Sequence, residues 1–166
     1  TLMVLTTGNG VQGFTLDPTI GSFLLSHGNM RIPPRGNIYS VNEGNRELWD
    51  DGFRRYIEYL QSPDPANGLP YKARYVGSMV ADVHRTLLSG GIFAYPGDRE
   101  NPNGKLRLMY EANPMAFLVE QAGGIATDGV RRILEITPTD VHERTPIILG
   151  SVEDIRIAEE FMTGKR

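Results

Sequence analysis

The sequence contains no cysteine, and this absence removes several classes of protein at once. Without thiols there is no disulfide framework, no thiolate nucleophile and no Cys-ligated zinc or iron–sulfur centre. A cysteine-free chain is typical of the cytoplasm, where disulfides are rare, and that is the location we expect.

The sequence also lacks an excess of positive charge and any long apolar run. Seventeen Lys and Arg against twenty Asp and Glu give a formal net charge of −3. This balance provides no overall basic field for nucleic acid. No stretch of about 18 apolar residues could span a bilayer, and no basic, apolar leader precedes the first strand-like segment. We therefore expect no nucleic-acid partner and no membrane partner.

The 166 residues, 40% of them hydrophobic, are enough to bury a core. The chain begins at Thr1, without an initiator Met, directly in strand-like sequence. We interpret this as a processed piece whose first residues pair with a sheet partly built from absent chain. The alternatives are removal of a tag and disorder ahead of Thr1.

Residues 1–41 are predicted to form an antiparallel meander, because short β-rich runs alternate with turn residues. After residue 42, helical and strand patterns alternate, which is typical of layered α/β proteins. We expect an α/β/α sandwich with a mixed sheet over 42–166, and we expect the meander to belong to the sheet of a missing N-terminal domain.

Within 42–166 the hydrophobic spacing predicts three helices before the last strands. The first lies within 42–61, with an apolar stripe at Phe53, Tyr56, Ile57 and Leu60. The second begins near Arg74 and ends at Gly90-Gly91, with a face made of Val76, Val80, Val83 and Leu87. The third has Asn113 as its N-cap and ends at Gly123-Gly124.

Strands are predicted at 92–96, 105–111, 125–129, 133–137 and 146–150, from their short apolar or alternating patterns. Ser151 and Asp154 are spaced as a capping pair and predict a final amphipathic helix.

One segment, 104–111, combines charges that suit a phosphorylated ligand. Lys105 and Arg107 lie on one face of the predicted strand, about 7 Å apart, and Glu111 follows where the strand meets a helix. A carboxylate beside phosphate-binding cations is what Mg²⁺-dependent phosphoryl transfer requires. The alternative is a strand edge with a solvated charged face.

A second candidate is Arg74-Tyr75 at the start of a predicted helix, where free N–H groups favour an anion. The alternative makes Arg74 a surface residue and Tyr75 a core ring. Asn42 precedes another probable helix, either as a plain N-cap or as a cap whose amide also meets a ligand.

Two tempting motifs are rejected. The segment from Asp17 to Ser22 resembles an Asp-Pro-x-Asp-Gly-Ser metal loop, but Ile20 replaces the second Asp, so we interpret it as a hairpin turn. The three histidines, His27, His84 and His142, are too far apart for metal-ligand spacing.

Four segments, taken in order, resemble class I fructose-1,6-bisphosphatase. They are Tyr39 to Gly44, Ala73 to Arg85, Gly90 to Phe93 with Tyr95-Pro96, and Gly104 to Pro114. The resemblance spans nearly the whole chain but covers only the C-terminal half of that enzyme. The half that carries the family's Asp-rich metal loop is not in this sequence.

The resemblance implies a role for each matching residue. The 6-phosphate of the sugar is held by Asn42, Tyr75, Tyr95 and Lys105. Arg74 reaches the same site of a neighbouring subunit, which implies a homotetramer, and Ser78 and Met79 lie beside the furanose. Arg107 and Glu111 are the catalytic residues of this half, and Glu111 is its one metal ligand. Asn45 departs from the family, where many members have a tyrosine that also binds this phosphate.

The implied reaction is hydrolysis of fructose 1,6-bisphosphate to fructose 6-phosphate and phosphate, a step of gluconeogenesis. It implies Mg²⁺ as cofactor, with Mn²⁺ or Zn²⁺ as alternatives, and the N-terminal half of the same enzyme as partner. This chain then contains most of the substrate-binding residues and is inactive alone. The open alternatives are action on sedoheptulose 1,7-bisphosphate, a non-catalytic sugar-phosphate-binding module, and an inactive proteolytic product.

Overall fold

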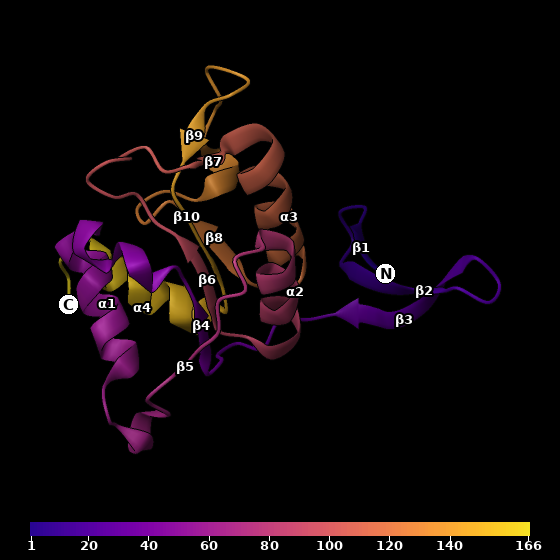
Figure 1. Ribbon diagram of the computed structural model, residues 1–166, viewed down its shortest axis with the longest axis horizontal. Coiled ribbons are helices and arrows are strands. Elements are labelled where there is room, and N and C mark those ends of the chain that lie inside the picture. The colour runs from indigo at the N-terminus through magenta and orange to yellow at the C-terminus, as the bar shows by residue number, and fades with distance from the viewer.

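The computed structural model describes residues 1–166 and contains two separate sheets and a short ribbon (Figure 1). The first sheet is the predicted meander, made of β1 (Leu2–Thr6), β2 (Val11–Asp17) and β3 (Ser22–Met30), all antiparallel. Its second turn is closed by Asp17, which accepts hydrogen bonds from the N–H and the hydroxyl of Thr19. The interpretation of this segment as a hairpin turn is therefore confirmed.

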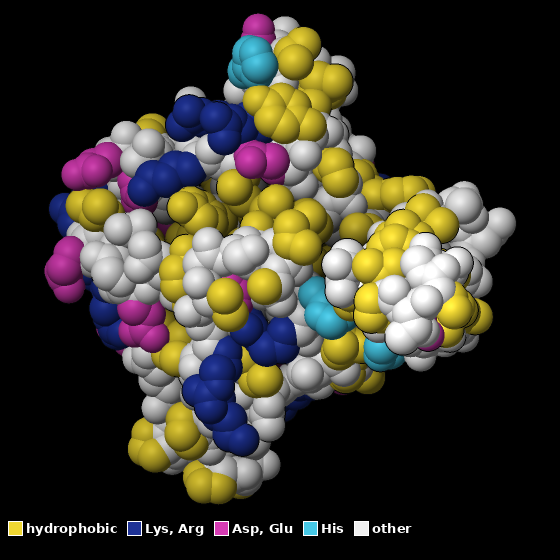
Figure 2. All heavy atoms as spheres, turned by 45° about the vertical axis from the view of Figure 1, so that its right-hand side comes forward, with side chains coloured by type: hydrophobic (Ala, Val, Ile, Leu, Met, Phe, Trp, Pro, Cys, Tyr) yellow, Lys and Arg dark blue, Asp and Glu magenta, His cyan; other side chains and the backbone are white.

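The meander stands to one side of the rest of the molecule (Figure 1). Val11 and Met30 enter a core beside α3 (Asn113–Gln121), and the Gly10 N–H donates to Gln121 Oε1. Apolar side chains gather on this lobe (Figure 2). Those left exposed are Met3, Leu5, Ile20, Phe23, Leu24 and Leu25.

The second sheet has five strands in the order β5-β4-β6-β10-β8. These are β4 (Ile38–Ser40), β5 (Lys72–Ala73), β6 (Ile92–Tyr95), β8 (Ile125–Thr127) and β10 (Ile147–Gly150). Strand β4 runs parallel to both β5 and β6, whereas β10 is antiparallel to β6 and β8. The sheet is mixed, as expected. The proposed division of the chain at residues 41 and 42 stays a prediction.

Helices cover both faces of this sheet (Figure 1). On one face, α1 (Asp51–Gln61) and α4 (Val152–Met162) bury their apolar stripes against Ile92, Ala94 and Ile148. On the other, α2 (Met79–Ser89) and α3 pack against Phe93, Ile147 and Leu149. Because side chains alternate along a strand, β6 and β10 supply both cores, and the predicted α/β/α sandwich is confirmed.

Helix α1 has the predicted stripe. Phe53, Tyr56, Ile57 and Leu60 are at most 1% exposed. Asp50 is the N-cap, and its carboxylate accepts the Phe53 N–H at 2.9 Å. A 3₁₀ turn, η1 (Glu43–Leu48), precedes the helix, so the predicted helix covers two elements.

Shortening Ile57 to valine is expected to lower the free energy of unfolding by about 0.5–1.5 kcal/mol, since it removes one buried methyl group. Urea denaturation measures this change. Val80→Ala is the control: Val80 is 66% exposed, so its loss should alter stability by less than about 0.5 kcal/mol. Equal losses in the two variants would contradict the packing described.

The second predicted helix begins later than expected. Helix α2 starts at Met79, and Val76 and Val80 are both 66% exposed, so the predicted face was half wrong. The buried face contains Asp82, Val83, Thr86 and Leu87. The helix ends at Gly90, as predicted.

The predicted strand 105–111 is mostly wrong. Strand β7 holds only Leu106–Arg107, paired with β9 (Arg144–Thr145), and residues Leu108–Ala112 form a π-helical turn, η3. Asn113 is not an N-cap, because its backbone is helical and its N–H donates to the Leu108 carbonyl.

Two smaller predictions also fail. Residues Ile133–Glu135 form a 3₁₀ turn, η4, and no strand. The predicted final helix is confirmed, since Ser151 is the N-cap residue of α4, but the capping hydrogen bonds are not formed. The Ser151 hydroxyl accepts the Gly91 N–H, and Asp154 accepts hydrogen bonds from the Gly36 N–H and the Tyr71 hydroxyl. A further 3₁₀ turn, η2, covers Pro65–Asn67. None of the helices is both long and apolar enough to cross a membrane.

Candidate functional site

The carboxyl ends of three parallel strands bring the predicted site residues to one edge of the sheet. Asn42 follows β4, Arg74 and Tyr75 follow β5, and Tyr95 is the last residue of β6. Since these strands are parallel neighbours, their carboxyl ends meet, and this is where open α/β sheets bind ligands.

A small hollow at this edge is lined by Asn42, Asn45, Tyr95 and Asp98, with Trp49 and Pro96 among its walls. The Asn42 carboxamide oxygen accepts the Gly44 N–H at 3.1 Å, so Asn42 caps the 3₁₀ turn η1 and not the helix that was predicted. Its capping role leaves the amide NH₂ available to a ligand.

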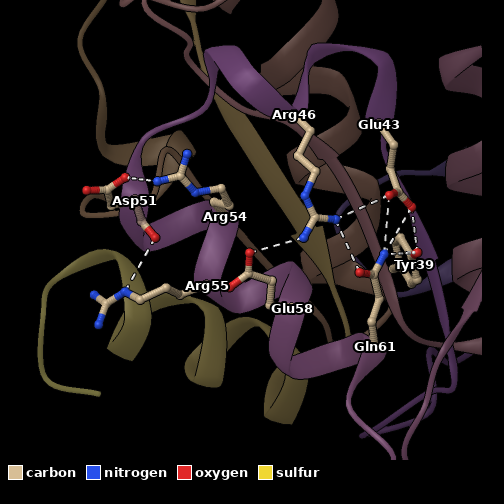
Figure 3. A network of polar contacts seen from close by, with 8 residues as sticks. All are labelled: Tyr39, Glu43, Arg46, Asp51, Arg54, Arg55, Glu58 and Gln61. Atoms are coloured by element: carbon tan, nitrogen blue, oxygen red, sulfur yellow. Dashed lines mark hydrogen bonds and ion pairs between the residues drawn. The ribbon is translucent and has the colours of Figure 1, made fainter.

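A polar network between η1 and α1 supports this turn (Figure 3). The buried Tyr39 hydroxyl donates to Glu43 Oε1 at 2.6 Å and accepts from Gln61 Nε2 at 2.7 Å. Arg46 joins the network through Gln61 Oε1 and Glu58 Oε1, at 3.2 and 3.1 Å. Burial raises the pKa of Tyr39 most, and the hydrogen bond to Glu43 raises it further. The hydroxyl therefore keeps its proton and stays a donor near neutral pH. The turn that carries Asn42 and Asn45 is thus tied to α1.

Lys105 comes to the same edge from the loop after β6. Its Nζ lies 3.0 Å from Asp98 Oδ2, and the Asp98 side chain is 3% exposed. Burial by itself would raise the pKa of Asp98, but hydrogen bonds from Asn101 and Lys105 outweigh it and lower that pKa. The Asp98 carboxylate is therefore charged at neutral pH.

Arg74 and Tyr75 do not lie at a helix N-terminus, which corrects the reason given for choosing them, because α2 begins four residues after Tyr75. Tyr75 is 39% exposed. Its partial burial raises its pKa, and the nearby Tyr95 and Asp82 raise that pKa further. The Arg74 guanidinium is exposed and donates only to the Ala73 carbonyl, at 2.8 Å. Ser78 is the N-cap residue of α2 and Met79 its first residue.

The fully buried Asp82 fixes the segment that carries these residues. Its carboxylate accepts the Val76 N–H at 3.1 Å and the Gly77 N–H at 3.2 Å. It also accepts a hydrogen bond at 2.7 Å from Arg85, whose same nitrogen donates to the Arg74 carbonyl at 2.8 Å. Asp82 and Arg85 together clamp residues 74–77 onto α2.

Substituting Asp82→Asn is expected to weaken sugar-phosphate binding about 2- to 10-fold, because an amide loses one acceptor and about one hydrogen bond to the segment, roughly 0.5–1.5 kcal/mol. Isothermal titration with fructose 6-phosphate measures this. Asp51→Asn, at an exposed acid of α1, is the control and should change nothing. An unaltered dissociation constant for Asp82→Asn would rule out the clamp as a determinant of binding.

Arg107 and Glu111 lie together one turn apart. Glu111 Oε2 accepts the Arg107 N–H at 2.6 Å and lies 3.7 Å from its guanidinium. Arg144 lies directly opposite Arg107 across β7 and β9. The structure has no group of three or more His, Asp or Glu side chains that could hold a metal ion. The role of Glu111 as a metal ligand stays a prediction.

The family model for the C-terminal domain of fructose-1,6-bisphosphatase matches residues 32–163. The chain belongs to this family. It is 59% identical over 165 residues to class 1 fructose-1,6-bisphosphatase of Chlorobium luteolum and 61% identical to that of Chloroherpeton thalassium, covering 99% of this chain in both. It spans 50% and 47% of the length of these two relatives.

The fold comparison agrees. The crystal structure of Leishmania major fructose-1,6-bisphosphatase in its holo form matches with a TM-score of 0.93 and 52% identity, over 98% of this chain and 49% of that one. The resemblance seen in the sequence is therefore confirmed, and the fold class with it.

Sequence reasoning missed the residues that support this candidate site. Asp82, Asp98 and the Tyr39–Glu43–Gln61 network were not singled out. Asp82 had a weak signal as an acid in the first turn of a helix. Asp98 had none, since it is one of several charges in a polar loop.

Proposed function

We propose that this chain is the substrate-binding half of a fructose-1,6-bisphosphatase, which hydrolyses fructose 1,6-bisphosphate to fructose 6-phosphate and phosphate. The observation that carries the proposal is that Asn42, Tyr75 and Tyr95 lie at the carboxyl ends of β4, β5 and β6, while Lys105 pairs with Asp98, which lines the hollow with Asn42 and Tyr95. Amide, hydroxyl and ammonium donors at one edge suit a phosphate group. The same proposal makes this hydrolysis a step of gluconeogenesis and places it in the cytoplasm.

In this proposal the four convergent residues hold the 6-phosphate, and Asn45 adds its amide from the same hollow. Ser78 and Met79 lie beside the sugar ring at the start of α2. The exposed Arg74 reaches the 6-phosphate site of a neighbouring subunit in a homotetramer. Binding the remote phosphate fixes the orientation of the sugar and places the 1-phosphate toward Arg107.

Arg107 and Glu111 are the proposed catalytic residues of this half. Arg107 neutralises charge on the 1-phosphate, and its backbone N–H aims the Glu111 carboxylate. A divalent ion, Mg²⁺ in the first place with Mn²⁺ or Zn²⁺ as alternatives, would polarise the 1-phosphoryl group when bound. Glu111 offers it one ligand, and the other ligands belong to the N-terminal half that we propose as partner.

One observation favours binding without catalysis for these 166 residues by themselves, namely the lack of any three-ligand metal group. The chain alone is then a sugar-phosphate-binding module, as one of the sequence alternatives has it. Sedoheptulose 1,7-bisphosphate stays the alternative substrate, since it presents a terminal phosphate to the same residues.

The test is a fluorescence titration of the chain with fructose 6-phosphate. Trp49 is the only tryptophan and lines the hollow, so its emission reports ligand there. We expect saturable one-to-one binding that inorganic phosphate competes away, and no binding of unphosphorylated fructose. Absence of binding by a chain that is folded by circular dichroism would refute the proposal.

A further inference from the structure

We propose that Asp98 competes with phosphate for the Lys105 ammonium. Asp98 holds this ammonium when the subsite is empty, and it thereby sets how tightly the subsite binds its ligand. The inference rests on the proposed function, because it concerns the same 6-phosphate subsite. It assigns a role to a residue that is neither a phosphate ligand nor a metal ligand.

The two oxygens of Asp98 have separate partners. Oδ1 accepts the Glu100 N–H at 3.0 Å, the Asn101 N–H at 2.7 Å and Asn101 Nδ2 at 3.0 Å, so it organises the loop. Oδ2 contacts only Lys105 Nζ, at 3.0 Å. One oxygen therefore stabilises the loop, and the other pairs with the lysine.

Asp98 also borders the proposed subsite. It lines the hollow together with Asn42, Asn45 and Tyr95, and its backbone forms an antiparallel bridge with Trp49, another lining residue. A phosphate group that reaches Asn42, Tyr95 and Lys105 together must approach this carboxylate. The low pKa of Asp98 keeps it charged at neutral pH.

Two opposing effects decide the sign of the contribution. A lysine already held in place loses less freedom when ligand binds, which favours affinity by about 2- to 10-fold. Two like charges about 6 Å apart near a protein surface repel enough to change a binding constant about 100-fold before salt screening. Repulsion wins, so Asp98 weakens the binding of phosphate.

The decisive variant is Asp98→Asn, which is isosteric. Its amide oxygen can keep all three loop hydrogen bonds, and only the contact to Lys105 is removed. We expect the dissociation constant of fructose 6-phosphate to fall about 5- to 20-fold, in a protein that is folded by circular dichroism and does not bind unphosphorylated fructose.

Glu100→Gln is the matched control. It removes the same charge from the same loop, but Glu100 is exposed and makes no side-chain contact with Lys105. Its dissociation constant should stay within about twofold of the original chain. Equal tightening in both variants would reduce the effect to net charge and overturn the inference.

Weaker or unchanged binding by Asp98→Asn would overturn it as well, because Asp98 would then position Lys105 or leave it unaffected. Failure of both folded proteins to bind refutes the proposed function itself, and the inference with it.

Discussion

Replacement of Lys105 by methionine is expected to weaken the binding of fructose 6-phosphate about 10- to 100-fold. The ammonium lies 3.0 Å from Asp98, which lines the hollow together with Asn42 and Tyr95. A charge-assisted hydrogen bond from it to phosphate contributes roughly 1.5–3 kcal/mol. Methionine keeps the length and apolar stem of the side chain. Isothermal titration of the chain with fructose 6-phosphate measures the loss.

Lys72→Met is the matched control for this variant. Lys72 is an exposed lysine on β5 with no acidic partner, so its replacement removes the same charge away from the hollow. Its dissociation constant should stay within about twofold of the original value. If Lys105→Met bound as tightly as Lys72→Met, the assignment of Lys105 to the 6-phosphate would be wrong.

The second large effect is expected from Glu111→Gln, in a chimera that joins this chain to the N-terminal half of the Chlorobium luteolum enzyme. Turnover should fall at least about 100-fold and the Mg²⁺ concentration for half-activity should rise, because loss of even an indirect metal partner costs 10- to 100-fold. The Michaelis constant should change little, since Glu111 does not contact the 6-phosphate subsite. Steady-state kinetics over a Mg²⁺ series measure all three.

Glu153→Gln in the same chimera provides the control. Glu153 is exposed on α4, on the other face of the sheet from α3 and Glu111. It should leave turnover and the Mg²⁺ requirement unchanged. An unaltered Mg²⁺ requirement in Glu111→Gln would exclude Glu111 as a metal ligand.

The parts of the fold that the sequence predicts are those with a clear hydrophobic period. Helix α1 shows its whole stripe because Phe53, Tyr56, Ile57 and Leu60 all pack on one sheet face. The predicted start of helix α2 was too early, because Val76 continues the hydrophobic spacing of the helix. The Asp82 carboxylate holds the Val76 and Gly77 N–H groups in a turn instead, and this contact leaves no trace in a hydrophobic pattern.

The failure at 105–111 has a different cause. Alternation over four residues suits a strand, but Pro114 has no N–H to donate to the preceding turn. The turn widens, and the Asn113 N–H reaches back five residues to Leu108. The resulting π turn brings Glu111 under the Arg107 N–H. An extended strand would have carried the two apart.

The residues of the candidate site were named from the sequence, whereas those that support it were not. Asn42, Tyr75, Tyr95 and Lys105 came from a family resemblance and stay predictions, and the parallel strands place the first three at one edge of the sheet. Asp98 could not be singled out, because its importance lies in which oxygen faces Lys105, and that depends on how the loop folds. Residues that position others carry little signal in a single sequence.

The measurement that tests the central claim most directly is phosphate release from fructose 1,6-bisphosphate with Mg²⁺ present, before and after the N-terminal half of the Chlorobium luteolum enzyme is added. The account predicts no release by this chain alone and restored turnover when the two halves are mixed. Release of phosphate by the chain alone would contradict this account. So would the absence of release from a mixture whose two halves are shown to associate, because the account places the substrate-binding residues of a shared site in these 166 residues.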